Sequence, residues 1–214
     1  MYISNEFSRL EIDLNGCLEN YRYFRSRLEA STRLLVLVKA NAYGHGAVQF
    51  ASLMEQAGAD YLAVAYPVEG IELRQAGIKS PIMVLTAGTD SFEQIVNYGL
   101  EPGIPNMYSL KILCGVLEKR GVRDFPVHIK IDTGMHRLGF MSDELPELFE
   151  FLSSCSSVKV KSVYSHLAAA DDPSCDDFTL GQVRLFKESA DRLTDAIGYK
   201  PIYHILNSAG IERF

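Results

Sequence analysis

The chain has 214 residues, of which 47% are apolar and 22% are charged, so it can bury the core of one globular domain. Its formal net charge of −6, without any basic cluster, argues against nucleic acid or an anionic membrane as the main partner. It has neither an apolar run of membrane-spanning length nor the basic and apolar regions of a signal peptide, so we expect a cytoplasmic protein.

Four cysteines are scattered along the chain, and none of them lies at the spacing of a zinc site. They are Cys17, Cys114, Cys155 and Cys175. Reduced thiols in a cytoplasm fit this pattern best, and we expect no metal site.

Short apolar runs typical of buried strands alternate with amphipathic stretches along the whole chain. The predicted strands are residues 33–40, 61–65, 81–86, 100–104, 127–132, 160–166 and 202–206. Between them, apolar side chains recur at helical spacing, as at Leu180, Val183 and Phe186. Glycines at 58, 77, 99, 121 and 198 predict helix ends. The predicted N-caps are Ser91, Asn106 and Ser142.

Each interval between predicted strands is long enough for a crossover helix, so neighbouring strands should be parallel. Sustained alternation of this kind leaves a doubly wound sheet or a (β/α)8 barrel. Polar residues collect at the C-terminal ends of strands all along the chain and favour the barrel, because all its strand tops meet at one mouth. These residues are Lys39, Asp132, His166, Asn207 and Ser208.

Only seven strands are predicted, so the expected fold is an incomplete (β/α)8 TIM-type barrel of about seven strand–helix units, with residues 1–214 as one domain. Before the first strand, residues 9–14 alternate like a further strand and 15–30 are typical of a helix. The chain resembles a fragment cut inside a barrel, whose first and seventh strands would expose unpaired edges. We therefore expect self-association or local disorder near residues 200–214.

The string VKANAYGHG, residues 38–46, places Lys39 at the end of the apolar run 34–38 and before a glycine-bearing polar turn. A lysine in line with a strand buried on both faces loses solvation, which lowers its pKa and suits an amine that attacks carbonyls. The alternative for a lone lysine at a strand end is a side chain that extends into water.

Alternation along two later strands predicts a polar inner face near the strand tops. His128, Lys130 and Asp132 share one side of the fifth strand, and Tyr164 and His166 share one side of the sixth. Barrel interiors are normally filled with branched apolar residues, so these positions are candidates for chemistry. A satisfied internal hydrogen-bond network is the alternative.

Three strings together resemble the alanine racemase family: residues 38–46, the string KIDTGMHRLG at 130–139, and NSAG at 207–210. The first two are highly specific, and the segment SHL at 165–167 falls between the last two in the expected order. The similarity covers essentially the whole chain. It implies the N-terminal barrel domain of a racemase that depends on pyridoxal 5′-phosphate, cut before the eighth strand and the C-terminal β domain.

The resemblance also implies roles for individual residues. Lys39 would bind the cofactor covalently and then act as a base on one face of the substrate. Tyr43 would contact the cofactor phosphate, and His166 would lie against its pyridine ring. Arg137 would bind its phenolic oxygen by a charge-assisted hydrogen bond. The turn after the seventh strand, with Asn207 and Ser208, would supply further phosphate contacts.

Lys130 carries a separate hypothesis. If it points inward beside Arg137, two cations share a poorly solvated space, which is costly. Many members of the family carbamylate the equivalent lysine, which turns this cation into an anion that orients the arginine. We expect the same modification at Lys130.

As a class, the resemblance implies racemisation of L-alanine to D-alanine for peptidoglycan synthesis, with two bases in a homodimer. The second base, an arginine for the pyridine nitrogen and another phosphate-binding tyrosine would lie beyond Phe214, so we expect this chain alone to be inactive and to bind the cofactor weakly. Three alternatives remain: a single-domain pyridoxal-phosphate-binding homeostasis protein, a racemase of another amino acid such as serine or lysine, and a non-catalytic interaction module.

Overall fold

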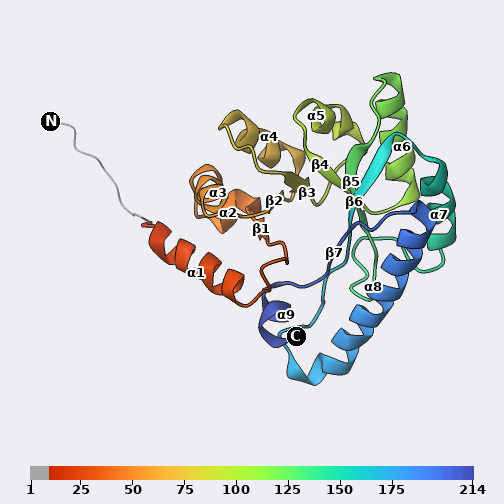
Figure 1. Cartoon of the computed structure of the whole chain (residues 1–214). Coiled ribbons are helices and arrows are strands. Elements are labelled where there is room, and N and C mark those ends of the chain that lie inside the picture. The colour runs from red at the N-terminus through yellow and green to blue at the C-terminus, as the bar shows by residue number, and fades with distance from the viewer. Residues whose placement is uncertain (1–9) are drawn as a thin grey trace.

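The computed structural model describes residues 10–214, in which parallel strands alternate with helices (Figure 1). The strands are β1 (Leu35–Leu37), β2 (Tyr61–Val64), β3 (Ile82–Val84), β4 (Glu101–Ile104), β5 (Phe125–Lys130), β6 (Val158–Tyr164) and β7 (Ile202–His204). The α-helices are α1 (Leu14–Ser26), α2 (Lys39–Tyr43), α3 (Ala47–Gln56), α4 (Pro67–Gln75), α5 (Phe92–Asn97), α6 (Met107–Lys119), α7 (Leu145–Ser154), α8 (Asp176–Ile197) and α9 (Ser208–Arg213). Two short 3-10 helices, η1 (Thr89–Ser91) and η2 (Pro173–Cys175), precede α5 and α8.

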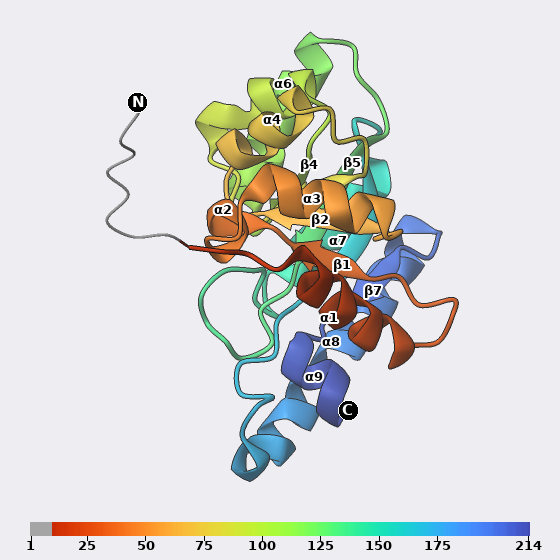
Figure 2. The ribbon, with the colours of Figure 1, turned by 90° about the vertical axis from the view of Figure 1, so that its left-hand side faces the viewer.

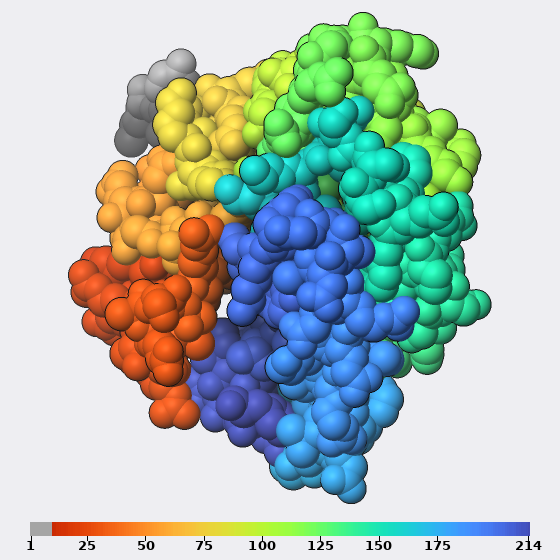
Figure 3. Space-filling model, turned by 45° about the vertical axis from the view of Figure 1, so that its right-hand side comes forward, coloured from red at the N-terminus to blue at the C-terminus, as the bar shows by residue number. Residues whose placement is uncertain are grey.

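The seven strands form one curled sheet in which each strand pairs in parallel with the next along the chain. Helices cover its outer face, so the fold is an incomplete (β/α) barrel, as predicted (Figure 1). Within the described residues, β1 pairs only with β2 and β7 pairs only with β6. The surface is hollowed between the N-terminal segment in orange and the C-terminal segment in blue, on the side where these two edges lie (Figure 3).

Two apolar layers lie on opposite faces of the sheet. The larger layer packs between strands and helices and contains the outward-facing residues of β5, such as Val127 and Ile129. The smaller layer fills the barrel interior and joins Ala63, Met83 and Tyr164 to partly buried leucines of β1. The period-two alternation of each strand therefore assigns one set of side chains to the helices and the other to the interior.

The first and last helices of the described chain contact each other across the open side of the sheet. The Tyr23 hydroxyl in α1 donates a hydrogen bond to the Glu212 carboxylate in α9 at 2.9 Å. Figure 2 shows the two helices next to each other, beside β1 and β7. β7 and α9 occupy residues 202–204 and 208–213, so the structure describes an ordered segment where local disorder was the alternative expectation. Self-association stays a prediction.

The seven predicted strands are all confirmed, with bounds that are mostly shorter than the apolar runs. The strand expected at 9–14 is wrong for its described part: residues 10–13 form no strand, and the Asp13 carboxylate instead accepts the Asn15 N–H at 2.9 Å at the start of α1. Arg9 lies outside the described residues.

The predicted helix caps have mixed outcomes. The five glycines predicted to end helices have positive φ, between 57° and 92°. Asn106 caps α6 by accepting the Ser109 N–H at 2.9 Å. Ser91 precedes α5 without a side-chain cap, because its hydroxyl donates to the Gly88 carbonyl. Ser142 is not a cap, since α7 begins three residues later, after Glu144. No helix within residues 10–214 is both long and apolar enough to cross a membrane.

Candidate active site

The turn that follows β1 has an unusual backbone. Lys39 is half-buried and is the first residue of α2, directly after the buried Val38. The next four residues, 40–43, have φ between 50° and 54°, the left-handed region. None of them is glycine, and a left-handed non-glycine residue costs on the order of 1 kcal/mol, so the surroundings must hold this turn in place.

Two side chains provide that support. One Glu69 carboxylate oxygen accepts the Ala40 N–H at 2.7 Å, while the other accepts the N–H groups of residues 65 and 66, at the top of β2. The Asn41 amide oxygen accepts the Ala47 N–H at 2.7 Å, where α3 begins. The lysine that the sequence singles out therefore stands on a backbone fixed to β2, α3 and α4.

Lys39 and Tyr43 lie together at the rim of the barrel mouth. The Lys39 Nζ is 5.9 Å from the centroid of the Tyr43 ring, and the ring is 61% exposed. This geometry leaves one face of the ring to the ammonium and much of the rest to solvent. The two residues that the first string predicts to act together are therefore neighbours.

Lys130 is buried in the mouth, with only 8% of its surface exposed, and its Nζ lies 5.5 Å from the centroid of the Tyr164 ring. Burial lowers the Lys130 pKa, and the nearby charges of Arg137 and Lys39 lower it further, while Asp132 acts in the opposite direction. The inward orientation that the sequence predicts for Lys130 is thus present.

His166 lies next to the same cations. Its pKa is lowered first by burial and then by Arg137, Lys130 and Lys39. Because the charges of Arg137, Lys130 and Lys39 all reach His166, these four side chains, predicted from three different parts of the sequence, lie near one another at one mouth. Such a mouth attracts anions and disfavours any further cation.

Asp132 does not neutralise this cluster by pairing with Lys130. One of its carboxylate oxygens accepts the N–H groups of Gly134 and His136, at 2.9 and 3.1 Å, and the other lies 3.4 Å from the His136 Nδ1. These hydrogen bonds hold the Asp132 pKa below its usual value despite burial. The carboxylate therefore shapes the loop that leads to Arg137, whose side chain is exposed.

The backbone that carries His166 is fixed by Gln182 of α8, which is only 1% exposed. Its amide nitrogen donates to the His166 carbonyl at 3.1 Å and to the Thr133 hydroxyl at 3.3 Å. Its amide oxygen accepts the Ala168 N–H at 3.0 Å. The Thr133 hydroxyl also bonds to the Ser165 hydroxyl at 2.8 Å, so the tops of β5 and β6 are tied to each other and to α8.

The turn after β7 is built mainly for its own stability. The Asn207 amide accepts the Gly210 N–H at 2.9 Å and donates to the Leu167 carbonyl at 3.2 Å, so it caps α9 and joins the turn to the segment after β6. A Cβ on Gly210 would lie 2.9 Å from the Leu167 side chain, so glycine is needed here for packing. Ser208 is exposed and leaves its hydroxyl to solvent.

A polar network lies deeper in the barrel interior, one inward-facing position before Lys130 in β5. The His128 ring bonds to the Glu101 carboxylate at 3.0 Å and to the Ser162 hydroxyl at 2.7 Å. The same hydroxyl lies 3.1 Å from the His204 Nε2, and His204 stacks on the Tyr164 ring. For His128 the satisfied internal network is therefore what the structure contains, while Lys130 and His166 face the mouth.

Sequence analysis missed Glu69 and Gln182. Glu69 carried one signal, because Pro67 followed by an acidic residue is typical of a helix start. Gln182 carries no such signal, because it is a polar residue among the apolar positions that helical spacing assigns to the buried side of α8. Leu180, one of those residues, is 42% exposed, whereas Gln182 and Phe186 are buried.

The side chains at the mouth suit an anionic organic ligand. No group of three or more histidine, cysteine or acidic side chains in residues 10–214 is placed to hold a metal. The mouth instead offers a half-buried amine, an exposed guanidinium, an imidazole with a lowered pKa and an aromatic rim. An amine and an arginine are the groups that would bind an aldehyde and a phosphate or phenolate.

Comparison with known proteins gives a consistent result. Residues 12–214 match the family model described as alanine racemase, N-terminal domain. Alanine racemase from Synechocystis sp. is 40% identical over 202 residues, which cover 94% of this chain and 54% of that enzyme. Alanine racemase from Thermodesulfovibrio yellowstonii is 36% identical over 211 residues, which cover 97% of this chain and 56% of that enzyme.

Solved structures show the same similarity. Alanine racemase from Clostridium difficile 630 in complex with cycloserine has a TM-score of 0.85 and 33% identity, over 91% of this chain and 54% of that one. Alanine racemase from Bartonella henselae with covalently bound pyridoxal phosphate has a TM-score of 0.82 and 28% identity, over 94% of this chain and 56% of that one. The chain spans about half the length of the curated relatives it matches.

Proposed function

The chain belongs to the alanine racemase family, and we propose that it forms the pyridoxal-phosphate-binding barrel of an enzyme that interconverts L- and D-alanine. The observation that carries the proposal is the gathering of Lys39, Lys130, Arg137 and His166 at one barrel mouth. The similar Bartonella henselae enzyme holds covalently bound pyridoxal phosphate, which is an anionic aldehyde in its free form. The mouth of this chain has the charge and the amine that such a molecule requires.

In this proposal each residue binds a different part of the cofactor. Lys39 would supply the amine that binds it covalently, and Arg137 would hold its phenolic oxygen in the anionic form by a charge-assisted hydrogen bond. His166 supplies a flat neutral ring beside the pyridine, because its lowered pKa keeps it uncharged. Tyr43 and the Asn207–Ser208 turn would contact the phosphate, with the Asn207 side chain acting through the cap that shapes the turn.

The reaction needs a proton to leave Cα of alanine on one face and another to arrive on the opposite face. When bound, the cofactor supplies delocalisation of the charge that develops at Cα. The Lys39 amine, once free, takes or returns the proton on its own face of Cα. The positive charges of Arg137 and Lys130 would strengthen the electrostatic field that holds the anionic groups in position.

The second base is proposed to lie outside the 214 residues, in a further domain of a partner subunit within a homodimer. A site with one base exchanges protons efficiently on one face only, so the chain alone should lack racemase activity. We further propose a cytoplasmic enzyme whose D-alanine serves peptidoglycan synthesis. Alanine turnover by the isolated chain at a rate close to that of a complete racemase would contradict the proposed division of the bases.

Cofactor binding can be tested directly. The chain is mixed with pyridoxal phosphate, reduced with borohydride to make the lysine bond permanent, and digested with trypsin. A modified Lys39 blocks cleavage, so the adduct should appear in the peptide 34–74. Lys39→Ala should abolish both this adduct and the visible absorbance of the lysine-bound cofactor, measured before reduction. Lys161→Ala, at an exposed lysine of β6, should leave both unchanged. Equal labelling of exposed lysines would overturn the assignment.

A further inference from the structure

Cys114 and Cys155 are distant in sequence and adjacent in the fold. Their sulfur atoms are 3.5 Å apart, although 41 positions separate them. Cys114 lies in α6 and is only 4% exposed, whereas Cys155 is half-buried in the turn that leads from α7 to β6. Two thiols at this distance are in van der Waals contact, and no disulfide joins them.

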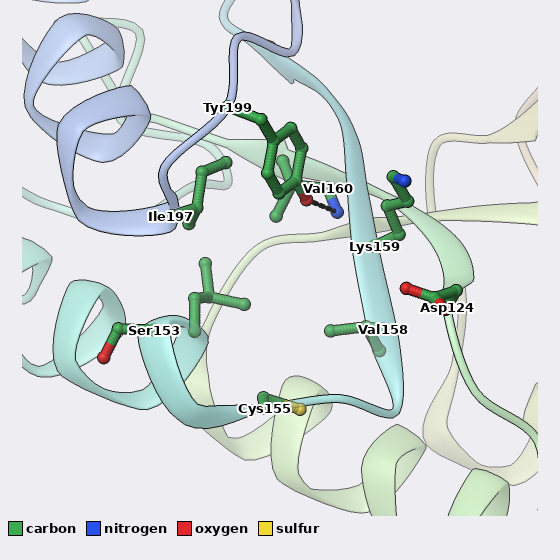
Figure 4. A pocket seen from close by; sticks show the side chains of 9 residues that line it. Asp124, Ser153, Cys155, Val158, Lys159, Val160, Ile197 and Tyr199 are labelled. Atoms are coloured by element: carbon green, nitrogen blue, oxygen red, sulfur yellow. Dashed lines mark hydrogen bonds between the residues drawn. The ribbon is translucent and has the colours of Figure 1, made fainter.

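Cys155 lines a pocket of about 190 Å³ near the N-terminal ends of β5 and β6, away from the barrel mouth. Asp124, Val158 and Tyr199 line the same pocket, and Figure 4 shows Cys155 at its edge, on the turn before β6. The pocket gives a small polar molecule access to the Cys155 sulfur. Cys114 does not line it, so an incoming molecule meets one sulfur before the other.

The two thiols also differ in chemistry. Burial and the neighbouring Cys155 raise the pKa of Cys114 to about 12, so it holds almost no thiolate near neutral pH. The thiolate is the nucleophile in thiol oxidation. Access therefore favours Cys155 as the thiol that reacts first, while the buried, protonated Cys114 can react only with a group already next to it.

We propose that Cys155 is a peroxide-reactive thiol and that Cys114 resolves it into an intramolecular disulfide. The Cys155 thiolate attacks one oxygen of hydrogen peroxide, the O–O bond breaks, and the departing hydroxide takes a proton to become water. The Cys114 sulfur then attacks the sulfenic sulfur of Cys155 and displaces a second hydroxide, which leaves as water with the Cys114 proton. Two thiols and one peroxide thus give one disulfide and two waters, with both electrons passing to the peroxide.

The local structure permits this bond. A disulfide has an S–S length of about 2.05 Å, so the sulfurs must approach each other by roughly 1.5 Å. Cys155 has extended backbone dihedrals, φ −84° and ψ 115°, in the short connection between α7 and β6, and it can move more easily than Cys114 within α6. The bond would tie α6 to this connection in the outer helical layer and leave the mouth unchanged.

The test treats the folded chain with one equivalent of hydrogen peroxide and analyses it by mass spectrometry without reduction. We expect a loss of about 2 Da, with the tryptic peptides 112–119 and 138–159 joined and then separated by dithiothreitol. The double variant Cys17→Ser/Cys175→Ser should give the same linked peptides. Links scattered among all four cysteines, or no internal link at all, would overturn the proposal.

Single variants test the order of reaction. In Cys114→Ser, the sulfenic acid at Cys155 has no resolving partner, so dimedone should label the peptide 138–159. In Cys155→Ser, the peptide 112–119 should be labelled at least about tenfold less, because Cys114 is buried and protonated. Equal labelling of the two peptides, or preferential labelling of Cys114, would contradict the proposed roles.

Discussion

Lys130 is a buried cation with two further cations, Arg137 and Lys39, as neighbours. Its lowered pKa increases the neutral amine, which is the form that combines with carbon dioxide to give a carbamate anion. Incubation with ¹³C-bicarbonate should therefore give a carbamate ¹³C resonance that is absent in Lys130→Met. Lys161→Met, which removes an exposed lysine from the neighbouring strand, should retain it. A resonance that persists in Lys130→Met would show that another amine is the modified one.

His204 should make the free energy of unfolding depend on pH. Burial lowers its pKa to about 3, from an unfolded value of about 6.5. Between pH 6.5 and pH 3, the unfolded chain therefore binds a proton at His204 that the folded chain does not. The contribution of His204 to the free energy of unfolding is complete above pH 6.5 and is lost as the pH falls toward 3. Between pH 7.5 and pH 5, the loss is about 2 kcal/mol.

Urea unfolding of the chain and of His204→Asn at these two pH values measures this loss. The variant should lose about 2 kcal/mol less stability than the parent on acidification, because asparagine does not titrate. The comparison removes the contribution of every other titrating group. An identical pH dependence in the two proteins would mean that His204 has the same pKa in the folded and unfolded chains.

Close packing between β4 and β6 depends on Gly103. A Cβ added there would lie 2.5 Å from the Tyr164 hydroxyl, which is itself buried without a hydrogen-bond partner. Gly103→Ala should lower the free energy of unfolding by about 1–3 kcal/mol through overpacking. Tyr164→Phe removes an unsatisfied buried hydroxyl and should raise it by about 1 kcal/mol.

The double variant of these two positions separates overpacking from a loss of backbone freedom. Because phenylalanine has no hydroxyl to clash with the new methyl group, Gly103→Ala should cost much less in the Tyr164→Phe background. Chemical denaturation of all four proteins gives the coupling energy. A cost that is the same in both backgrounds would show that the hydroxyl is not the obstacle.

The contact between α4 and the turn after β1 gives a prediction for Glu69. Its carboxylate accepts three backbone N–H groups, including that of Ala40. Glu69→Gln replaces one acceptor oxygen with a donor and weakens the remaining bonds, so the free energy of unfolding should fall by about 2 kcal/mol. Glu72→Gln, at an exposed position of the same helix, should change it by less than about 0.5 kcal/mol. If both variants changed the free energy of unfolding equally, Glu69 would not be the support of the turn.

The elements best predicted from the sequence are those that a few neighbouring residues determine. Buried strands appear as apolar runs, and Gly198 or Asn106 mark helix ends by their own backbone and side-chain chemistry. The strand expected at residues 9–14 is wrong in its described part, because an alternation of apolar and polar residues also occurs in a segment that leads into a capped helix. Ser142 failed because α7 starts at a later residue.

The parts of the site that were predicted are the reactive side chains, and the parts that were missed are their supports. Lys39 and Lys130 stand at strand ends, where the barrel brings distant residues together. The left-handed turn at 40–43 is held by a glutamate 29 positions beyond Ala40, and the His166 carbonyl by a glutamine 16 positions farther along the chain. No local pattern encodes such contacts, because they exist only once the strands are in place.

The open side of the barrel gives a prediction for the whole chain. The outer edges of β1 and β7 lack a strand partner among the described residues, and a cavity of about 40 Å³ between them is lined by Leu35, Ile202 and His204, among others. Unpaired edges with apolar residues beside them bind other strands, so the chain should self-associate. Light scattering after size-exclusion chromatography should show a mass that rises with protein concentration.

Leu35→Lys tests whether this side is the interface. It adds a charge beside the β1 edge, and edge charges oppose strand pairing, so the rise in mass should shift to at least about tenfold higher concentration. Val68→Lys, at a 70% exposed position of α4 away from the opening, is the matched control and should associate like the parent. Circular dichroism confirms that both variants are folded. Unchanged association in Leu35→Lys would place the contact on another surface, and a constant monomer mass in the parent would contradict self-association itself.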